Sequence, residues 1–500
     1  MSDPYDTATD IYAQVVDLET TDFLLFWDGE VMMPEGGIPA RASQRSTVTA
    51  LKDELLASER LGEALEAIEE TELTELQQAN VREIRREHRT ASRIPAELSE
   101  RIGEFVGEAG EVWKQARADD DWEAFAPSLE QNVELRREWG KHANPAVDPY
   151  VALWEEGVGY HSQPYVPYDT VDRLFDRLRA RLVPLIEEIR ASDVDPGADV
   201  VEGEYDETEQ MALARDALSF VGLDWERARL DTSTHPFSYG TQFDARVTTR
   251  FDPAEPFDGL LSTLHEFGHT DYTQGLPRDE FGLPTGNPRG LAVHESQSRL
   301  WENHVGRSRA FWEAFLPTFV DRFPRHEGLT VDEVYGAVNR VREENLIRVE
   351  ADELTYHLHI ILRTEIEREL MSGDLDVADV PQEWNAKMDE YLGVVPETDT
   401  EGCLQDIHWS KNLPGFISYT VGSVIAAQLW NALESDIPDV DQRIADGEFD
   451  AVHSWLEEQV HQHGQRYTTS DLVERATGEP ITADPFLDYV ESKFTALYDL

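Results

Sequence analysis

The sequence is poor in cysteine and in basic residues. Cys403 is the only cysteine among 500 residues, so no disulfide can form within the chain and nothing demands an oxidising compartment. There are 43 basic residues against 101 acidic ones, which gives a formal net charge of −58. Because a surface of that sign repels phosphate groups, the charge argues against nucleic-acid binding.

The acidic residues are spread along the whole chain instead of being gathered in one tail. A tract that binds a polycationic partner would concentrate them. A protein that works in concentrated salt can distribute them, because screening shrinks their mutual repulsion. We therefore interpret the composition as adaptation to high salt.

Long apolar runs are also missing. No stretch approaches the length that spans a bilayer, and the first residues, Met1-Ser-Asp-Pro-Tyr-Asp6, lack the apolar segment of a signal peptide. Hydrophobic residues still make up 40% of the chain and aromatic residues 10%, which is enough for a large core. We expect a soluble, cytoplasmic, globular protein without a membrane partner.

Helical periodicity dominates the first part of the chain. Within residues 1–144, apolar side chains recur at spacings of three and four, as in Leu61-Leu65-Ile68, which predicts antiparallel helices stacked as a wall or lid. The chain shows no internal repeat and no long linker. We therefore predict a single catalytic domain over residues 1–500, with its motif-bearing core at 228–430.

Several elements after this wall have clear boundaries in the sequence. Helices are predicted from Tyr168 to about Ser192 and from Met211 to Gly222, and Thr330-x-x-Glu333 is a capping box that opens a long helical region ending near Gly373. Two Thr-rich segments, Arg229–Thr234 and Gln242–Arg250, alternate polar with apolar residues and predict two strands. The edge of such a sheet could hold an extended peptide through backbone hydrogen bonds.

The segment His265-Glu-Phe-Gly-His269 is the strongest chemical signal. On a helix, histidines four residues apart leave the same face and can hold one small cation, and Glu266 lies close enough to reach a water on that cation. Zinc peptidases use this arrangement to acidify a water and remove its proton. Asp252-Pro253 is the predicted start of the helix, with Phe257, Leu260, Leu261 and Leu264 on its apolar face. Gly268 suggests that something approaches the backbone closely at this position.

A catalytic zinc site takes a third protein ligand and leaves one position for water. The downstream candidates are Asp271, Asp279, Glu280, His294, Glu295 and Glu302. Asp271 is too near on the same helix, whereas Glu295 lies on a second helix that could pack against the first. The residues alone favour Glu295 without excluding the others.

Further motifs resemble those of a known family. His294-Glu-Ser-Gln-Ser-Arg-Leu-Trp-Glu-Asn303 and the His265–His269 motif look like those of the carboxypeptidase Taq family of metallocarboxypeptidases. Four more motifs in chain order are similar to that family: His235-Pro-Phe237, Asp244-x-Arg246-x-Thr248, Ile347-Arg-x-x-Ala-Asp-Glu-x-Thr-Tyr356 and Gly402-x-x-Gln-Asp-x-His-Trp409.

The resemblance implies a fold, a ligand set and an activity. It implies His265, His269 and Glu295 as metal ligands and Glu266 as the general base. It implies a mainly helical, bundle-like fold with a deep central groove, a small β-sheet next to the metal helix, and commonly a homodimer. The implied reaction is removal of single residues from the C-terminus of peptides with broad preference.

Other residues in these motifs have candidate roles in holding a peptide. Arg348 is the favoured partner for the substrate's terminal carboxylate, with Arg246 as its rival. Arg348 could instead pair with Glu344 or Asp352, and Arg246 with Asp244. His235 could contact substrate or support the sheet.

His408 and Tyr419 are candidate donors to the tetrahedral intermediate, or else buried packing residues. After Trp409 the family typically has Phe-Gly-Tyr-Phe-Pro-Thr/Ser-Tyr, whereas this chain has Pro414-Gly-Phe-Ile-Ser-Tyr-Thr420, which is one residue shorter. The departure affects the register of Tyr419 and leaves the metal residues untouched.

We interpret the sequence as a metal-dependent carboxypeptidase with zinc, and cobalt or manganese as possible alternatives. The alternative from another class is a peptide-binding or scaffold protein that keeps the groove without catalysis. A metal-dependent endopeptidase or a peptidase that releases dipeptides would use the same metal chemistry.

Overall fold

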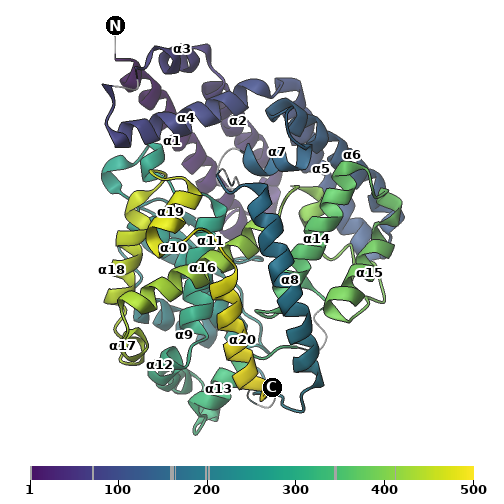
Figure 1. Ribbon diagram of the computed structural model, residues 1–500, viewed down its shortest axis with the longest axis vertical. Coiled ribbons are helices and arrows are strands. Elements are labelled where there is room, and N and C mark those ends of the chain that lie inside the picture. Colours follow the sequence, from purple (N-terminus) through teal and green to yellow (C-terminus); the bar gives the residue numbers. More distant parts are fainter. Residues whose placement is uncertain are drawn as a thin grey trace. The chain divides into compact units, whose positions relative to one another are not determined.

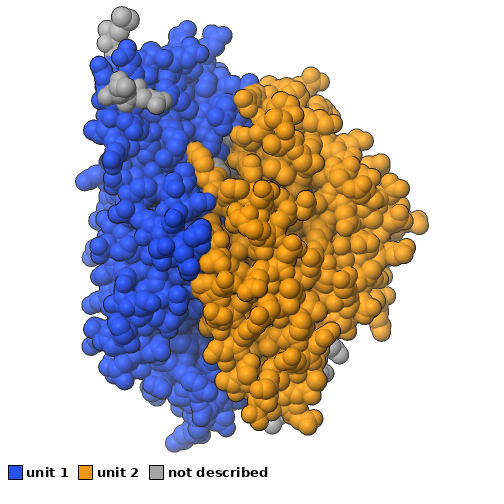
Figure 2. Space-filling model, in the orientation of Figure 1, with its two compact units in different colours: residues 1–92, 197–338, 425–480 blue, residues 93–196, 339–424, 481–500 orange. Residues whose placement is uncertain are grey.

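Helices make up most of the chain, as the periodicity predicts (Figure 1). The computed structural model describes residues 3–69, 72–157, 163, 165–197, 200, 203–342, 346–411 and 413–500. The chain divides into two compact units, coloured separately in Figure 2, and each unit is assembled from three separated stretches. Unit 1 contains residues 1–92, 197–338 and 425–480, and unit 2 contains residues 93–196, 339–424 and 481–500.

Unit 1 carries the HExxH helix and the sheet. Its helices are α1 (Pro4–Val31), α2 (Ile38–Leu56), α3 (Glu59–Ala67), α4 (Glu75–Arg93), α9 (Glu207–Phe220), α10 (Pro256–Gly275), α11 (Leu291–Arg299), α12 (Arg309–Arg322), α13 (Val331–Val338), α17 (Val440–Ala445), α18 (Asp450–Gln459) and α19 (Thr469–Thr477). A π-helix, η5 (Leu300–Gly306), follows α11 directly. Short 3₁₀ turns lie at η1 (Glu35–Gly37), η3 (Arg278–Glu280), η4 (Pro284–Gly286), η6 (Pro324–His326) and η10 (His461–His463).

The regular elements of unit 2, in its described residues, are all helices. Its helices are α5 (Ala96–Asp119), α6 (Trp122–Ala143), α7 (Pro149–Glu155), α8 (Tyr168–Ala191), α14 (Thr355–Ser372), α15 (Val380–Leu392) and α20 (Asp484–Tyr498), with 3₁₀ turns η7 (Arg348–Glu350), η8 (Val377–Asp379) and η9 (Ile407–Ser410). The boundary between the two sets of residues falls inside α16 (Ile417–Asp436).

The helix boundaries agree with the local signals in most places. α8 begins at Tyr168 as predicted, and in the capping box the N–H of Thr330 donates to Glu333 while the N–H of Glu333 donates to the Thr330 hydroxyl. Gly373 ends α14 with a positive φ of 88°, a conformation that suits glycine. The region between these signals is not one long helix, because α13 ends at Val338 and α14 begins only at Thr355.

The sheet has one strand more than predicted. β1 (Ala228–Thr232) and β3 (Ala245–Thr249) are the two expected strands, but they run parallel, and β2 (Ser238–Gly240) pairs antiparallel with β3, so that the order is β1-β3-β2. Parallel neighbours need a crossover connection, and β2 lies within that connection. The sequence signal was weak because β2 has only three residues.

The pairing of β2 leaves alternate backbone groups pointing away from β3. The N–H of Thr248 donates to the carbonyl of Phe237, and the N–H of Thr241 donates to the carbonyl of Asp244. Antiparallel strands exchange these bonds at every second residue. The N–H and C=O groups of Ser238 and Gly240 therefore face the outer edge of the sheet.

α10 starts later than the sequence suggested. Asp252-Pro253 forms a turn ahead of the helix, in which the Asp252 carboxylate accepts the N–H of Ala254, and the first helical residue is Pro256. A second proline at the first helical position, where no N–H is needed, explains the shift. The apolar face is as predicted, since Phe257, Leu260, Leu261 and Leu264 are all buried.

The predicted mainly helical fold with a small sheet beside the metal-motif helix is therefore confirmed, and α10 packs against both β2 and β3. Within the described residues, no helix has the length and apolar character needed to cross a membrane.

Candidate metal centre

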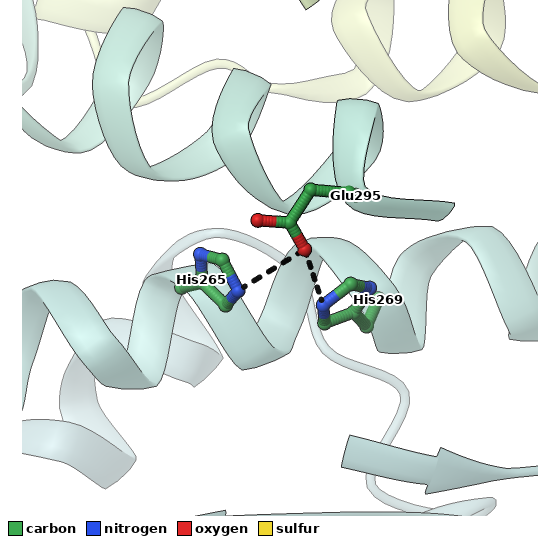
Figure 3. A group of neighbouring side chains, drawn as sticks. All are labelled: His265, His269 and Glu295. Atoms are coloured by element: carbon green, nitrogen blue, oxygen red, sulfur yellow. Dashed lines mark ion pairs between the residues drawn. The ribbon is translucent and has the colours of Figure 1, made fainter. Parts of the chain in front are cut away.

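Two histidines of α10 and one glutamate of α11 converge on a single point. Figure 3 shows His265, His269 and Glu295 with their donor atoms facing one another, and one ligand atom from each lies within 4.8 Å of the others. The Oε2 atom of Glu295 is 3.8 Å from Nε2 of His265 and 3.5 Å from Nε2 of His269. Ligands held about 2.0–2.1 Å from one tetrahedral ion lie about 3.4 Å apart, so the three residues fit a metal.

Glu266 supplies an independent test of that fit. Its Oε2 atom is buried and has no hydrogen-bond partner among the described residues, an expensive state for a carboxylate. Burial raises the pKa of Glu266, and the nearby histidines oppose that rise. An acceptor left without a donor beside three ligands matches a carboxylate whose partner is a water on a bound cation.

The glutamate ligand is oriented by an arginine. Arg299, one turn further along α11, donates from Nε to Oε1 of Glu295 at 2.8 Å. Burial alone would raise the pKa of Glu295, but Arg299 and the two histidines hold it well below its usual range. Glu295 is thus ionised, with Oε2 facing the Nε2 atoms of His265 and His269 and Oε1 occupied by Arg299.

His265 is oriented by a second glutamate. Its Nδ1 atom lies 2.9 Å from Oε2 of Glu302, which places the proton on Nδ1 and leaves the Nε2 lone pair for a metal. Glu302 also accepts from Arg299 at 3.1 Å and from Arg307 at 3.0 Å. These cations hold the pKa of Glu302 well below its usual value against the effect of burial.

His269 is oriented by a third histidine. Its Nδ1 atom lies 2.6 Å from Nδ1 of His294, so one of the two rings donates and the other accepts. If His269 offers Nε2 to the metal, its Nδ1 carries the proton and donates to His294. Burial and the neighbouring His269 lower the pKa of His294 well below its usual value, which agrees with a neutral acceptor.

Gly268 allows α10 and α11 to approach this closely. A Cβ at this position would lie 2.4 Å from the carbonyl oxygen of Gln297 and 2.5 Å from Cα of Ser298. Any side chain would push the two helices apart and separate the histidines from Glu295. The close backbone approach predicted at Gly268 is confirmed.

The remaining ligand candidates lie elsewhere. Asp271 accepts from Trp301 at 3.1 Å and pairs with His453 at 2.9 Å. Glu280 accepts the hydroxyl of Thr285 at 2.8 Å, and Asp279 lies in the turn η3.

Three supporting residues were not recognised in the sequence. Arg299 could have been found from its spacing to Glu295 and Glu302, since residues three or four positions apart meet on one helix face. Arg307 is five positions from Glu302 and reaches it at the end of the π-helix η5, which helical spacing does not predict. His453 is 182 positions from Asp271, so no local pattern could have indicated their contact.

The sheet residues named from the sequence lie in unit 1 with the metal centre. The Ser238 hydroxyl on β2 lies 2.6 Å from the hydroxyl of Thr270, the residue after His269. Arg246 pairs with Asp244 at 2.8 Å, and its guanidinium lies 4.2 Å from the ring centre of Trp27. His235 is exposed, and its carbonyl accepts from Ser233.

Arg348, His408 and Tyr419 lie together in unit 2. Arg348 donates from Nε to Asp406 at 2.7 Å and from Nη1 to the Tyr356 hydroxyl at 3.3 Å. Asp406 also contacts Nδ1 of His408. The Tyr419 ring packs near those of Phe416 and Tyr356.

The suggested pairing of Arg348 with Asp352 was wrong. Asp352 accepts the N–H groups of Leu354 and Thr355 instead, and Arg348 lies in a 3₁₀ turn. Glu344 lies outside the described residues.

A helical fold with a His–His–Glu cluster beside an unpaired carboxylate has the features of a metal-dependent peptidase. The sequence profile of the carboxypeptidase Taq (M32) metallopeptidase family matches residues 7–494. Thermostable carboxypeptidase 1 of Thermus thermophilus is 37% identical over 506 aligned residues that cover 99% of each chain. The protein of the same name from Pyrococcus furiosus is 35% identical, with 94% of each chain covered.

Solved structures agree. The M32 carboxypeptidase from Deinococcus radiodurans R1 superposes with a TM-score of 0.93 at 36% identity and covers 99% of this chain and 100% of that one. Trypanosoma cruzi metallocarboxypeptidase 1 gives a TM-score of 0.91 at 32% identity, covering 98% of this chain and 99% of its own. The chain belongs to the carboxypeptidase Taq (M32) metallopeptidase family and is a metallocarboxypeptidase. The resemblance seen in the motifs is confirmed.

Proposed function

We propose that this enzyme removes single residues from the free C-terminus of peptides with broad residue preference, using a metal held by His265, His269 and Glu295 and Glu266 as the general base. The observation that carries the proposal is the buried, unpartnered Oε2 of Glu266 beside the three converging ligand atoms. Family membership supports peptides as substrates.

A divalent cation in this site would supply an acidified water and polarise the scissile carbonyl. Glu266 takes the proton of the attacking water on its free Oε2 atom and then passes it to the departing amine nitrogen. Its raised pKa suits a group that must both accept and release a proton.

Arg348 is proposed to pair with the terminal carboxylate of the peptide. A planar guanidinium binds a carboxylate through two parallel hydrogen bonds, and Arg348 is mostly buried beside Tyr356. Arg246 is the second candidate, and its stacking on Trp27 and pairing with Asp244 favour a structural role. The outward backbone groups of Ser238 and Gly240 would hold the peptide chain, with the exposed His235 as a further substrate contact.

The developing oxyanion needs a donor besides the metal, and Tyr419 and His408 are the proposed donors. The Tyr419 hydroxyl can donate a hydrogen bond. His408 contacts Asp406 through Nδ1 and has a lowered pKa, chiefly through burial. The neutral ring carries no proton on Nε2, so His408 donates there only when it is charged.

Zinc is the proposed metal, because two imidazoles and one monodentate carboxylate form its usual catalytic ligand set. Cobalt or manganese would fit the same donors. Metal analysis of the purified protein, followed by reconstitution of the chelated form with each ion, tests the assignment.

The charge of −58 supports a protein adapted to concentrated salt, and we propose that it works in the cytoplasm as a homodimer. Thermal unfolding across a salt series tests the first point, and light scattering at high salt tests the second. Equal stability in dilute and concentrated salt would contradict salt adaptation.

The deciding experiment is mass-resolved digestion of one peptide with a free C-terminus and of its C-terminal amide, in high salt, with zinc and with a chelator. We expect a metal-dependent ladder from the free peptide only, losing one residue at a time. Internal cuts in both peptides would indicate an endopeptidase, and loss of two residues at a time a dipeptide-releasing enzyme. No cutting despite bound metal would indicate a peptide-binding scaffold.

A further inference from the structure

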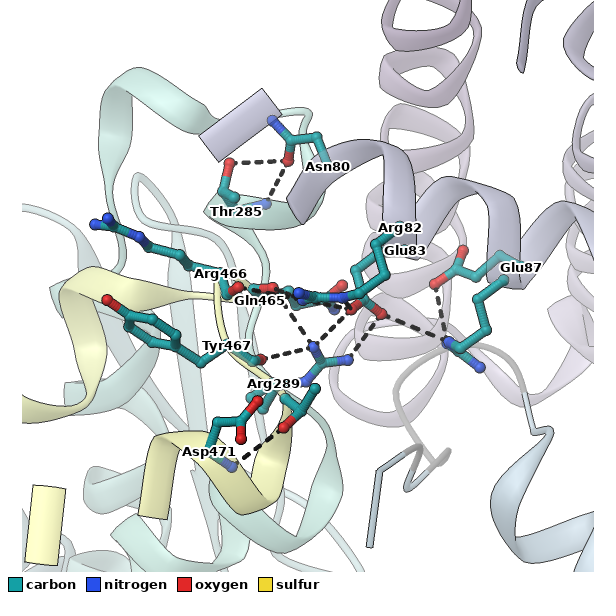
Figure 4. Close-up of polar contacts among 12 residues, drawn as sticks. Asn80, Arg82, Glu83, Glu87, Thr285, Arg289, Gln465, Arg466, Tyr467 and Asp471 are labelled. Atoms are coloured by element: carbon teal, nitrogen blue, oxygen red, sulfur yellow. Dashed lines mark hydrogen bonds and ion pairs between the residues drawn. The ribbon is translucent and has the colours of Figure 1, made fainter. Parts of the chain in front are cut away.

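A buried ion pair lies just ahead of the helix that carries the glutamate ligand. Arg289 is 1% exposed and Glu83 on α4 is fully buried. The guanidinium donates from Nη1 and Nη2 to the two oxygens of Glu83, each at 3.0 Å (Figure 4). Although burial opposes ionisation, Arg289 lowers the pKa of Glu83 to about 2, so both partners are charged.

Arg289 and the preceding Pro288 are held from two further sides within unit 1. Its Nη1 atom donates to the carbonyl of Tyr467 at 3.0 Å, and its backbone N–H donates to the Tyr272 hydroxyl on α10 at 2.9 Å. Gln465 donates its side-chain amide to the carbonyl of Pro288 at 2.9 Å. Bonds from α4, α10 and residues 465–467 therefore hold this segment from three sides.

The anchored segment leads directly into α11. Gly290 follows Arg289 with a φ of 125°, a value that residues with a side chain rarely adopt. The carbonyl of Gly290 accepts the N–H of His294. α11 then rises about 6 Å from Leu291 to the ligand Glu295. On the other side of the contact, Tyr272 lies one turn beyond the ligand His269 on α10.

Two contacts thus set the position of α11 against α10. Gly268 sets how closely the helices approach, but a glycine contact does not prevent one helix from sliding along the other. The Arg289 anchor opposes that sliding, because Tyr272 and Glu83 hold Arg289, which lies two residues ahead of Leu291, the first residue of α11. A slide along the axis would carry Glu295 Oε2 away from the two histidine nitrogens.

Stability alone does not explain a charged pair at this place. Apolar residues of similar volume often replace a buried ion pair with no loss of stability, whereas bidentate pairing specifies a geometry. We propose that Arg289 and Glu83 are positioning residues that set the register of α11 on α10 and thereby the metal affinity. This inference rests on the metal site proposed above.

The helix α4 gains a role that its sequence does not indicate. In the same part of the helix, Arg82 donates to the carbonyl of Gln465 at 2.8 Å, and Asn80 accepts the N–H of Thr285 at 3.0 Å (Figure 4). α4 therefore binds the segment 465–467, which contacts Arg289, and the turn η4, which precedes Arg289 in the chain. A helix without catalytic groups thus supports the third proposed metal ligand.

The test measures Zn²⁺ affinity by chelator competition and records the visible spectrum of the Co²⁺-substituted protein, which reports ligand geometry. The variants are Arg289→Lys, which keeps the charge but not the bidentate fork, Glu83→Gln, and the double variant Glu83→Met with Arg289→Met. Glu353→Gln is the matched control, because it breaks a similarly buried ion pair with Lys493 in unit 2. The parent protein is measured first, and absence of metal from it would reject the proposed site itself.

We expect a 10- to 100-fold weaker Zn²⁺ affinity and a changed Co²⁺ spectrum in the Arg289 and Glu83 variants, with both unchanged in Glu353→Gln. The double variant removes both charges of the Arg289–Glu83 pair. The buried Arg86, which lies 3.5 Å from Glu83, keeps Glu87 as a partner at 3.5 Å, so the double variant should fold even if Glu83→Gln does not. A folded double variant that binds Zn²⁺ as tightly as the parent, with the parent's Co²⁺ spectrum, would overturn the positioning role and leave the metal site intact.

Discussion

Two aspartate–histidine pairs, one in each unit, have similar contacts and opposite protonation. In unit 1, His453 contacts Asp271 at 2.9 Å through Nδ1 and the carbonyl of Val221 at 2.7 Å through Nε2. Two acceptors require two protons, so the ring is charged. Burial alone would lower the pKa of His453, but Asp271 and the carbonyl raise it to about 9.

In unit 2, His408 contacts Asp406 in the same way and has a lowered pKa. Burial is the main cause, and the nearby cations Arg348 and Lys411 add to the lowering against the opposing effect of Asp406. Asp406 also pairs with Arg348. His453 differs because Asp271 and the Val221 carbonyl both accept its protons.

The two regions also differ in the groups that they offer to a substrate. Around α10, the charged groups leave one acceptor without a donor, on Glu266, which suits a proton-transfer site. Around Arg348, a cation and a neutral imidazole surround one carboxylate, which suits recognition of a second carboxylate. We therefore expect substitutions in unit 1 to affect turnover or metal binding, and those in unit 2 to affect substrate affinity.

The largest effect is expected for Glu266→Gln. The amide keeps the shape of the side chain but cannot take a proton, so turnover should fall about 10²- to 10⁴-fold with metal affinity retained. Steady-state kinetics and metal analysis of the same sample measure both. Glu295→Gln is the control, because it should lose metal as well. An active Glu266→Gln enzyme would refute the assignment of the base.

A smaller loss is expected for Arg348→Met. Without the guanidinium, kcat/KM should fall about 10- to 100-fold, mainly through KM, because a charged hydrogen-bonded contact is lost. The pKa of His408 should rise, since Asp406 is no longer shared, and NMR titration of the ring measures it. Arg348→Lys keeps the charge and serves as control. An unchanged KM together with a raised His408 pKa would show that Arg348 affects His408 but does not bind the substrate carboxylate.

Glu302→Gln should weaken metal binding without removing it. His265 would lose its charged acceptor, and metal affinity should fall about 10- to 100-fold. Competition with a chelator measures the change, with Asp406→Asn in unit 2 as the control. Affinity equal to that of the parent enzyme would show that His265 needs no carboxylate partner.

The smallest effect concerns stability at alkaline pH. Because the folded-state pKa of His453 is about 9 against an ordinary value of 6.5, its contribution is full below pH 6.5 and is lost as pH rises through 9. The loss between pH 7 and 9 is about 2 kcal/mol. Denaturant unfolding at both values measures it, and His453→Gln should remove this pH dependence.

The sequence was sufficient for residues whose roles depend on local spacing. The shared face of the two histidines of α10 and the buried face around Leu264 follow from helical geometry. Gly268 indicated that something approaches the backbone closely. The strand β2 was missed because three residues carry too little pattern. The start of α10 was predicted too early because Pro253 and Pro256 both suit the first turn of a helix, and the helix begins at Pro256.

Long-range partners could not be predicted. His453 meets Asp271, and Glu83 meets Arg289, only because the fold brings distant segments together. Asp406 was part of a recognised motif, but its pairing with Arg348 was not foreseen. Charged pairs between distant segments leave no periodic signal, whereas ligand motifs on one helix do.

The contact at Gly268 also bears on which cation the enzyme can hold. Helices whose backbones touch at this residue keep the donor atoms of His265, His269 and Glu295 within 4.8 Å of one another. Zinc-sized ions accept four ligands at about 2.0–2.2 Å, whereas calcium needs six to eight oxygen ligands at about 2.3–2.6 Å, and two of the three donors here are nitrogens. A spacing that suits a small ion therefore depends on a missing side chain, three residues from His265 and one residue from His269.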